Sequence, residues 1–142
     1  MSDDQDLEYR LDDQVGYILR RVYQRHTGIF AKLMPEDLTP TRFAAMVKLL
    51  ELGTLSQNEL GRQTSMDIAT IKGVVDRLKA RNFAKSQRDP KDGRRQMISL
   101  TSEGKAVVEN ALPFAKNVTE KTIANLSPEE RIQLIGLLKK LC

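Results

Sequence analysis

The chain has 142 residues, 40% of them hydrophobic and 30% charged, a composition typical of an ordinary globular protein. No apolar run approaches the ~18 residues that would indicate a membrane span. The net charge of +4 is unevenly spread: residues 56–95 alone carry ten bases and five acids. A positive field concentrated in the middle of the chain is what a phosphate-binding surface requires, so the composition favours a nucleic-acid partner.

The two ends of the chain exclude other classes. The first 13 residues hold six acids and one base, and they lack the apolar core of a secretory signal. Cys142 is the single cysteine, which rules out an internal disulfide framework and favours a reducing cytoplasm, where the protein would associate with the nucleoid. A disulfide across a dimer and a free thiol without a role both remain open for Cys142.

Two helices are predicted before residue 54. Residues 11–34 carry an apolar stripe at helical spacing, formed by Leu11, Val15, Ile18, Val22, Ile29 and Leu33. Proline at position 35 ends this helix. Thr39 as N-cap and Pro40 at the first helical position begin the second helix, which Gly53 closes.

The next two predicted helices are separated by a short turn. Ser56 and Glu59 have the spacing of a capping box, which starts a short helix ending near Arg62. After a turn at residues 63–66, a further helix spans about 67–81, and Asn82 ends it in a left-handed conformation. The inner face of this second helix is predicted to consist of Ile68, Ile71, Val75 and Leu78.

A hairpin and two more helices follow. Residues 83–88 and 96–100 read as strands joined by the polar turn 89–95, which contains proline and glycine. Thr101 caps a long helix over about 102–125, where Pro113 is expected to introduce a kink. A second capping box, Ser127 to Glu130, begins the last helix.

This order predicts a mainly α fold with a small β-hairpin, a winged helix-turn-helix flanked by dimerisation helices. We expect an N-terminal dimerisation helix in 1–38, a DNA-binding lobe in 39–101, and C-terminal dimerisation helices in 102–142. The lobe resembles the MarR family of bacterial regulators. The resemblance rests on Leu55–Leu60, on Asp67–Leu78 as recognition helix, on Arg88–Arg95 as wing, and on the run Leu100-Thr101-Ser102-Glu103-Gly104. It covers about 50 residues.

The resemblance implies a DNA-binding surface made of the recognition helix and the wing. Short polar side chains at the start of the helix would read base edges, and glycine would let the backbone approach closely. Arg94 would enter the minor groove with its guanidinium held by Asp92, while Lys91 and Arg95 meet phosphates. The expected contacts on the turn and helix are Ser65, Asp67, Ala69, Thr70, Lys72, Gly73 and Arg77.

The single histidine, His26, allows two interpretations. It lies within the apolar stripe of the first helix, so it is either a core or interface histidine bonded to a neighbour or a ligand contact. Residues 19–26 resemble the first helix of members that sense small aromatic acids of hydroxybenzoate or nicotinate breakdown. The resemblance implies an aromatic carboxylate near Arg20 and His26. Its walls would be Tyr17, Phe43 and Met46.

The predicted function is therefore a homodimeric repressor that binds a pseudo-palindromic operator in double-stranded DNA and is released by a small aromatic acid. An architectural DNA-binding protein without a ligand, or a protein-interaction module on the same fold, is the alternative. An enzyme is not expected, since there is no Ser/His/Asp order and no phosphate-cradling glycine loop. A metal site or other cofactor is not expected either, because the one histidine and one cysteine lie 116 positions apart.

Overall fold

The computed structural model describes residues 8–142, so the acidic residues Asp3, Asp4 and Asp6 lie outside it. The chain begins with a short 3₁₀ turn, η1, and continues with six α-helices and three strands in the part described. The helices and strands are η1 (Leu11–Asp13), α1 (Val15–Leu33), α2 (Pro40–Leu52), β1 (Leu55–Ser56), α3 (Gln57–Gln63), α4 (Ile68–Ala80), β2 (Ala84–Arg88), β3 (Gln96–Leu100), α5 (Ser102–Thr122) and α6 (Pro128–Lys139).

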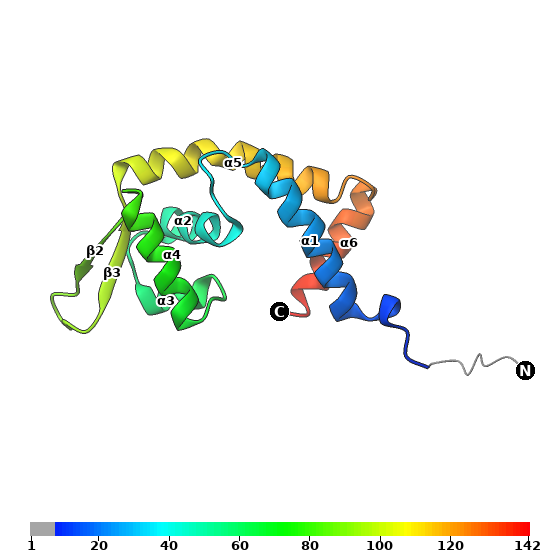
Figure 1. Ribbon diagram of the computed structural model, residues 1–142, viewed down its shortest axis with the longest axis horizontal. Coiled ribbons are helices and arrows are strands. Elements are labelled where there is room, and N and C mark those ends of the chain that lie inside the picture. The colour runs from blue at the N-terminus through cyan, green and yellow to red at the C-terminus, as the bar shows by residue number, and fades with distance from the viewer. Residues whose placement is uncertain (1–7) are drawn as a thin grey trace, which may run out of the picture.

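The molecule has the outline of an arch with α5 along its top (Figure 1). One end of α5 meets a lobe made of α2, α3, α4 and the sheet, and the other end lies beside α1 and α6. Helix α1 packs chiefly on α5. Within residues 8–142, no helix is both long enough and apolar enough to cross a lipid bilayer. The predicted class, mainly α with a small β-hairpin, is confirmed.

Side-chain caps set most helix starts at the predicted residues. The Thr39 hydroxyl accepts the N–H of Arg42, and Gly53 ends α2 at a φ of 77°. Ser127 and Glu130 form a complete capping box at α6. At α3 only half of the predicted box exists: Ser56 accepts the N–H of Glu59 at 3.2 Å. The Glu59 carboxylate instead accepts hydrogen bonds from Arg62 and Gln63.

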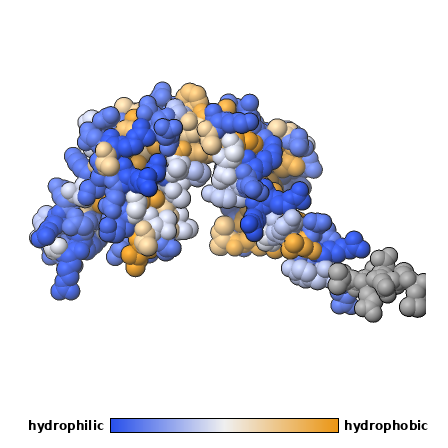
Figure 2. Space-filling model, viewed as in Figure 1, coloured by the Kyte–Doolittle hydropathy of each residue, from blue (hydrophilic) through white to orange (hydrophobic). Residues whose placement is uncertain are grey.

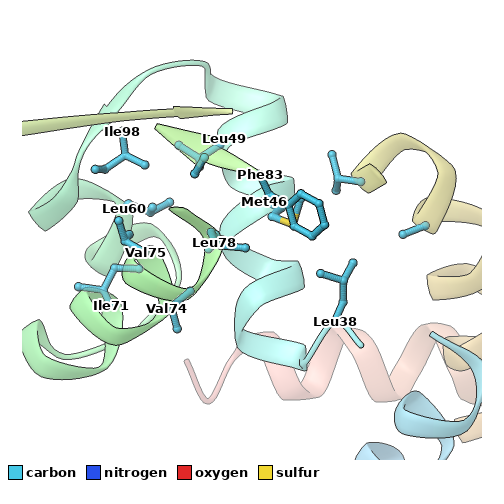
Figure 3. Packing of buried hydrophobic residues seen from close by; sticks show 14 of the residues in the cluster. Leu38, Met46, Leu49, Leu60, Ile71, Val74, Val75, Leu78, Phe83 and Ile98 are labelled. Atoms are coloured by element: carbon cyan, nitrogen blue, oxygen red, sulfur yellow. The ribbon is translucent and has the colours of Figure 1, made fainter. Parts of the chain in front are cut away.

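The core of the lobe lies beneath α4. Ile71, Val74, Val75 and Leu78 pack against side chains of the other elements of the lobe, among them Met46, Leu49, Leu60, Phe83 and Ile98 (Figure 3). The spacing predicted that Ile68 would join this core, and this prediction is wrong: the Ile68 side chain is 75% exposed. Val74, which the predicted stripe omitted, is buried instead.

The three strands form an antiparallel sheet in the order β1-β3-β2. Strands β2 and β3 make the predicted hairpin, with Ser86 opposite Ile98. Strand β1 was not predicted; it pairs Leu55 with Ile98 and so ties the start of α3 to the hairpin. Asn82, at a φ of 61°, ends α4 in the predicted left-handed conformation.

The residues between the hairpin and α5 form a compact joint. The Thr101 hydroxyl donates to the carbonyl of Asn82 at 2.6 Å and accepts the N–H of Gly104 at 2.9 Å. The Thr101 N–H donates to the carbonyl of Phe83 at 3.1 Å. The Leu100–Gly104 run therefore joins the end of the sheet, the end of α4 and the start of α5.

Candidate nucleic-acid interface and effector cleft

The outward face of α4 carries the residues that the sequence assigns to base contacts. Ala69, Thr70, Lys72, Gly73 and Arg77 are all exposed. Asp67 is the N-cap, and its Oδ1 accepts the N–H of Thr70 at 2.7 Å. Hydrogen bonds from the side chain and backbone of Thr70 lower the pKa of Asp67. The free N-terminus of α4 is thus held in shape by a charged cap, which leaves the other side chains of the first turn free for contacts.

Ser65 supplies the turn that leads into α4. Its φ of 56° lies in the left-handed region, and its side chain is exposed. Further along α4, the Lys72 ammonium lies 3.0 Å from the Asp76 carboxylate, so it must leave this ion pair to reach a base or a phosphate. For Arg77 no ion pair forms within residues 8–142. Of the two cations on this face, Arg77 is therefore freer than Lys72 to contact DNA.

The wing is shaped by its two aspartates. Asp89 Oδ1 accepts the N–H of Lys91 at 2.9 Å, and Asp89 Oδ2 lies 3.8 Å from the Arg95 guanidinium. Asp92 Oδ1 accepts the backbone N–H of Arg94 at 3.1 Å. The sequence suggested that Asp92 holds the Arg94 guanidinium. In the structure Asp92 instead stabilises the turn by accepting the backbone N–H of Arg94. In the described part of the chain that guanidinium forms no ion pair, and it is exposed at the end of the hairpin.

A hollow of about 380 Å³ connects the wing to α3. It brings Arg94 and Arg95 together with Arg62 and with polar side chains at the start of α3; its lining is Ser56, Gln57, Asn58, Arg62, Arg94, Arg95 and Gln96. The α3 residues were not predicted as contacts. The sequence signal that points to them is the polar run Ser56–Glu59 followed by Arg62, but only β1 pairing with β3 places this run beside the wing.

His26 lies on α1 and faces α5. It is half-buried, and its Nδ1 lies 2.9 Å from the hydroxyl of Thr122. Because that hydroxyl donates to the carbonyl of Val118, it accepts from His26, which assigns the ring proton to Nδ1. Arg25 donates to the carbonyls of Lys121 and Thr122. These bonds fasten α1 to the end of α5.

An apolar cavity of about 500 Å³ opens beside His26. Helices α1, α5 and α6 provide its lining, which is Leu19, Val22, Tyr23, His26, Thr119, Thr122, Ile123, Leu134, Ile135 and Leu138. The other expected ligand residues do not gather there. Tyr17 and Arg20 lie earlier on α1, Phe43 packs edge-on against Phe30, and Met46 has no exposed surface. Met46 belongs to the core and offers no wall to a ligand in this conformation.

A second hollow, of about 380 Å³, lies between α1 and the lobe. Tyr23 stands on one side, and the start of α2 and the turn before α4 stand on the other. The full lining is Tyr23, Pro40, Thr41, Ala44, Thr64, Ser65, Met66, Asp67 and Thr70. This hollow lies between the first helix and the lobe and reaches the first turn of α4, and neither Arg20 nor His26 is part of its lining.

Comparison with known proteins agrees with this geometry. The model of the MarR family matches residues 38–95. The HTH-type transcriptional repressor NicR of Pseudomonas putida is 38% identical over 134 residues, which cover 94% of this chain and 85% of the relative. The transcriptional regulator HosA of Escherichia coli is 29% identical over 131 residues, 92% of this chain and 96% of HosA.

Solved structures share the whole fold. A probable transcriptional regulator from Pseudomonas aeruginosa is 47% identical with a TM-score of 0.90, covering 94% of this chain and 100% of that one. BpsR of Bordetella bronchiseptica, whose DNA binding is regulated by 6-hydroxynicotinic acid, is 40% identical with a TM-score of 0.89, covering 94% of this chain and 96% of BpsR. On these matches, the chain belongs to the MarR family and is a DNA-binding transcriptional regulator with a winged helix-turn-helix.

Proposed function

We propose that this protein is a homodimeric repressor that binds a pseudo-palindromic operator in cytoplasmic DNA and is released by a small aromatic carboxylate. The observation that carries the DNA-binding part is the exposed surface formed by α4, the wing and the hollow between the wing and α3. Arg62, Arg94 and Arg95 line that hollow. Arg62 is paired with Glu59 and Arg95 lies 3.8 Å from Asp89, whereas Arg94 forms no ion pair within residues 8–142. Such a surface suits the alternating phosphates beside a groove.

The homodimer is proposed from the distribution of exposed apolar side chains. Among residues 8–142, the large hydrophobic residues left exposed within 39–101 are Leu52 and Ile68 alone. The others lie on the segment before α2, on α5, and on or just after α6, and include Val15, Ile18, Ile132, Ile135 and Leu137. A face of this kind favours a second copy of the chain over water. Two copies joined there would present two recognition helices to successive turns of DNA.

The effector site is proposed at the hollow between α1 and the lobe. Tyr23 lines this hollow, and His26, three residues later on α1, lines the apolar cavity that Tyr23 also lines. Arg20 lies three residues before Tyr23, one turn away. Tyr23 and His26 stack with their ring centroids 6.0 Å apart. An aromatic ring would lie against Tyr23, and Arg20 would bind its carboxylate. The similarity to BpsR, whose DNA binding is regulated by 6-hydroxynicotinic acid, supports an acid of this class.

Release of DNA follows from differential affinity. An acid in this hollow touches α1 and the first turn of α4 together, so it stabilises one spacing of lobe and helix over another. The loop after α1 also contacts the end of α4: Arg81 donates to the carbonyl of Glu36, and its guanidinium lies 3.2 Å from the Glu36 carboxylate. A shift of α1 is therefore passed to both ends of the recognition helix.

The test combines operator selection by the purified protein with calorimetry on a panel of aromatic acids that includes 6-hydroxynicotinic acid. We expect one acid to bind in the micromolar range and to weaken operator binding. Arg20→Ala and His26→Ala should lower its affinity at least tenfold, while Arg21→Ala, a control that removes the neighbouring cation, should not. If wild type and both site variants bind the acid with equal affinity, the effector site lies elsewhere. If the purified protein selects no operator, the proposed repressor function is wrong.

A further inference from the structure

Ile68 is an exception among the side chains of the lobe. It is 75% exposed, more than Leu52 at 49%, the other large hydrophobic residue exposed within 39–101. It occupies the first position of α4, directly after the Asp67 cap. The rest of the apolar stripe of α4 is buried at Ile71, Val75 and Leu78. Within residues 8–142 nothing covers Ile68, so its apolar surface is available at the end of the helix that would enter the major groove.

The neighbours of Ile68 make this end of α4 apolar. The Asp67 carboxylate is engaged with the N–H of Thr70, and the Lys72 ammonium is drawn toward Asp76, one turn further from the start of the helix. Ala69 and Thr70, both exposed, each add a methyl group. In Figure 2 an apolar patch appears at the lower end of the lobe, where Figure 1 shows α4 beginning. The start of α4 is therefore a small apolar patch within a surface that is otherwise charged.

In the major groove, the apolar group that DNA offers is the C5-methyl of thymine, which adenine, guanine and cytosine lack. Resting on the proposed DNA-binding function, we infer that Ile68 is a specificity-determining residue that contacts a thymine methyl in each operator half-site. The Ile68 side chain leaves water when it meets that methyl group, and the gain is lost when either partner is removed. Arg94 and the other cations of the surface supply affinity for any sequence, whereas Ile68 selects thymine.

The test removes the methyl groups one at a time. In the operator selected by the wild-type protein, each thymine is replaced by deoxyuridine, which keeps base pairing and lacks only the C5-methyl. We expect one position in each half-site at which wild type loses about fourfold in affinity, the contribution of one buried methyl group. Ile68→Ala should bind the thymine operator more weakly and show no further loss with deoxyuridine at that position. Because Ile68 is exposed, its replacement should leave the midpoint of thermal unfolding unchanged.

Leu52→Ala is the matched control, since Leu52 is the other exposed large hydrophobic residue of the lobe and lies at the end of α2. It should keep the wild-type response to every deoxyuridine. If Ile68→Ala shows the same deoxyuridine losses as wild type, or if wild type shows none, the assignment of Ile68 is overturned while DNA binding stands. If wild type selects no operator, the proposed function fails and this assignment fails with it.

Discussion

Gly104 lies against the backbone of Phe83 so closely that a methyl group at residue 104 would stand 1.9 Å from the Phe83 carbonyl oxygen. That oxygen also accepts the N–H of Thr101 at 3.1 Å. The start of α5 and the start of the hairpin therefore touch backbone to backbone. The glycine of the Leu100–Gly104 run is required by this contact, since no flexible side chain is there to give way.

Gly104→Ala should destabilise the protein by about 1–3 kcal/mol or more, the usual cost of forcing an extra methyl into a packed site. Urea unfolding measures the change. Gly73→Ala on the outward face of α4 is the control: outside its own helix turn nothing lies within 4 Å of the added methyl, so stability should hold or rise slightly. A Gly104→Ala protein as stable as wild type would show that the two backbones separate at little cost.

Gly73→Ala should separate stability from DNA binding. Nothing lies within 4 Å of a methyl at this outward position of α4, and alanine favours a helix interior by about 0.5–1 kcal/mol. We expect a higher midpoint of unfolding together with weaker operator binding, because the methyl would keep the backbone from the DNA. Unchanged operator affinity would mean that Gly73 faces away from the duplex.

Arg94→Ala should weaken operator binding and reduce its dependence on salt. Removing one phosphate-neutralising or groove-bound cation per subunit lowers the slope of log affinity against log salt by about 0.9 for each. Titrations at several salt concentrations measure this slope. Lys116→Ala, which removes an exposed cation from α5, should leave both values unchanged. An Arg94→Ala protein with the wild-type slope would exclude the wing from the interface.

Arg81 and Arg77 are predicted to behave oppositely. The Arg81 guanidinium contacts Glu36 and lies 4.7 Å above the centre of the Phe83 ring, whereas Arg77 is exposed on the outward face of α4. Arg81→Ala should cost about 1–2 kcal/mol of stability through the lost hydrogen bond and cation–π contact. Arg77→Ala should leave stability unchanged and weaken operator binding. The reverse pattern in unfolding and DNA titrations would contradict both assignments.

The capping carboxylate of Asp67 should make the stability of the folded protein decrease at acidic pH. Its pKa is lowered in the folded protein by hydrogen bonds from Thr70, so its contribution is complete above the ordinary pKa of an aspartate and disappears as the pH falls through the lowered value. Asp67→Asn keeps a capping oxygen without titrating. The difference in unfolding midpoint between wild type and Asp67→Asn should therefore shrink on acidification. A difference that stays constant with pH would contradict this role.

Features that depend on contacts within one turn of chain could be predicted from the sequence. Thr39, Ser127 and Asn82 take their predicted roles because a cap involves residues only a few positions away. The same local rule was insufficient at Ser56, where Arg62 and Gln63 compete for the Glu59 carboxylate. A spacing rule shows which residues can meet but not which of several partners is preferred.

Features that depend on the packing of distant segments were missed. Ile68 continues the stripe of α4 in phase, but at the first position of the helix it is exposed, whereas Ile71 three residues later is buried. Strand β1 has only two residues, and its existence depends on β3, some forty positions away. For the effector, the sequence pointed to the first helix, but it could not show that Met46 is buried while Tyr23 faces the cleft.

Helix α5 joins the two ends of the arch (Figure 1). It runs without a break from Ser102 to Thr122 and contains Pro113 near its middle. Proline lacks the N–H that would bond to the carbonyl of Glu109, so the helix is softest to bending there. Between Pro113 and the lobe lie about eleven residues, or about 16 Å at 1.5 Å per residue. A bend of roughly 10° at this point would displace the start of α5 by about 3 Å. Over this length of helix, a small change of angle at Pro113 is enough to put a recognition helix out of register with its groove.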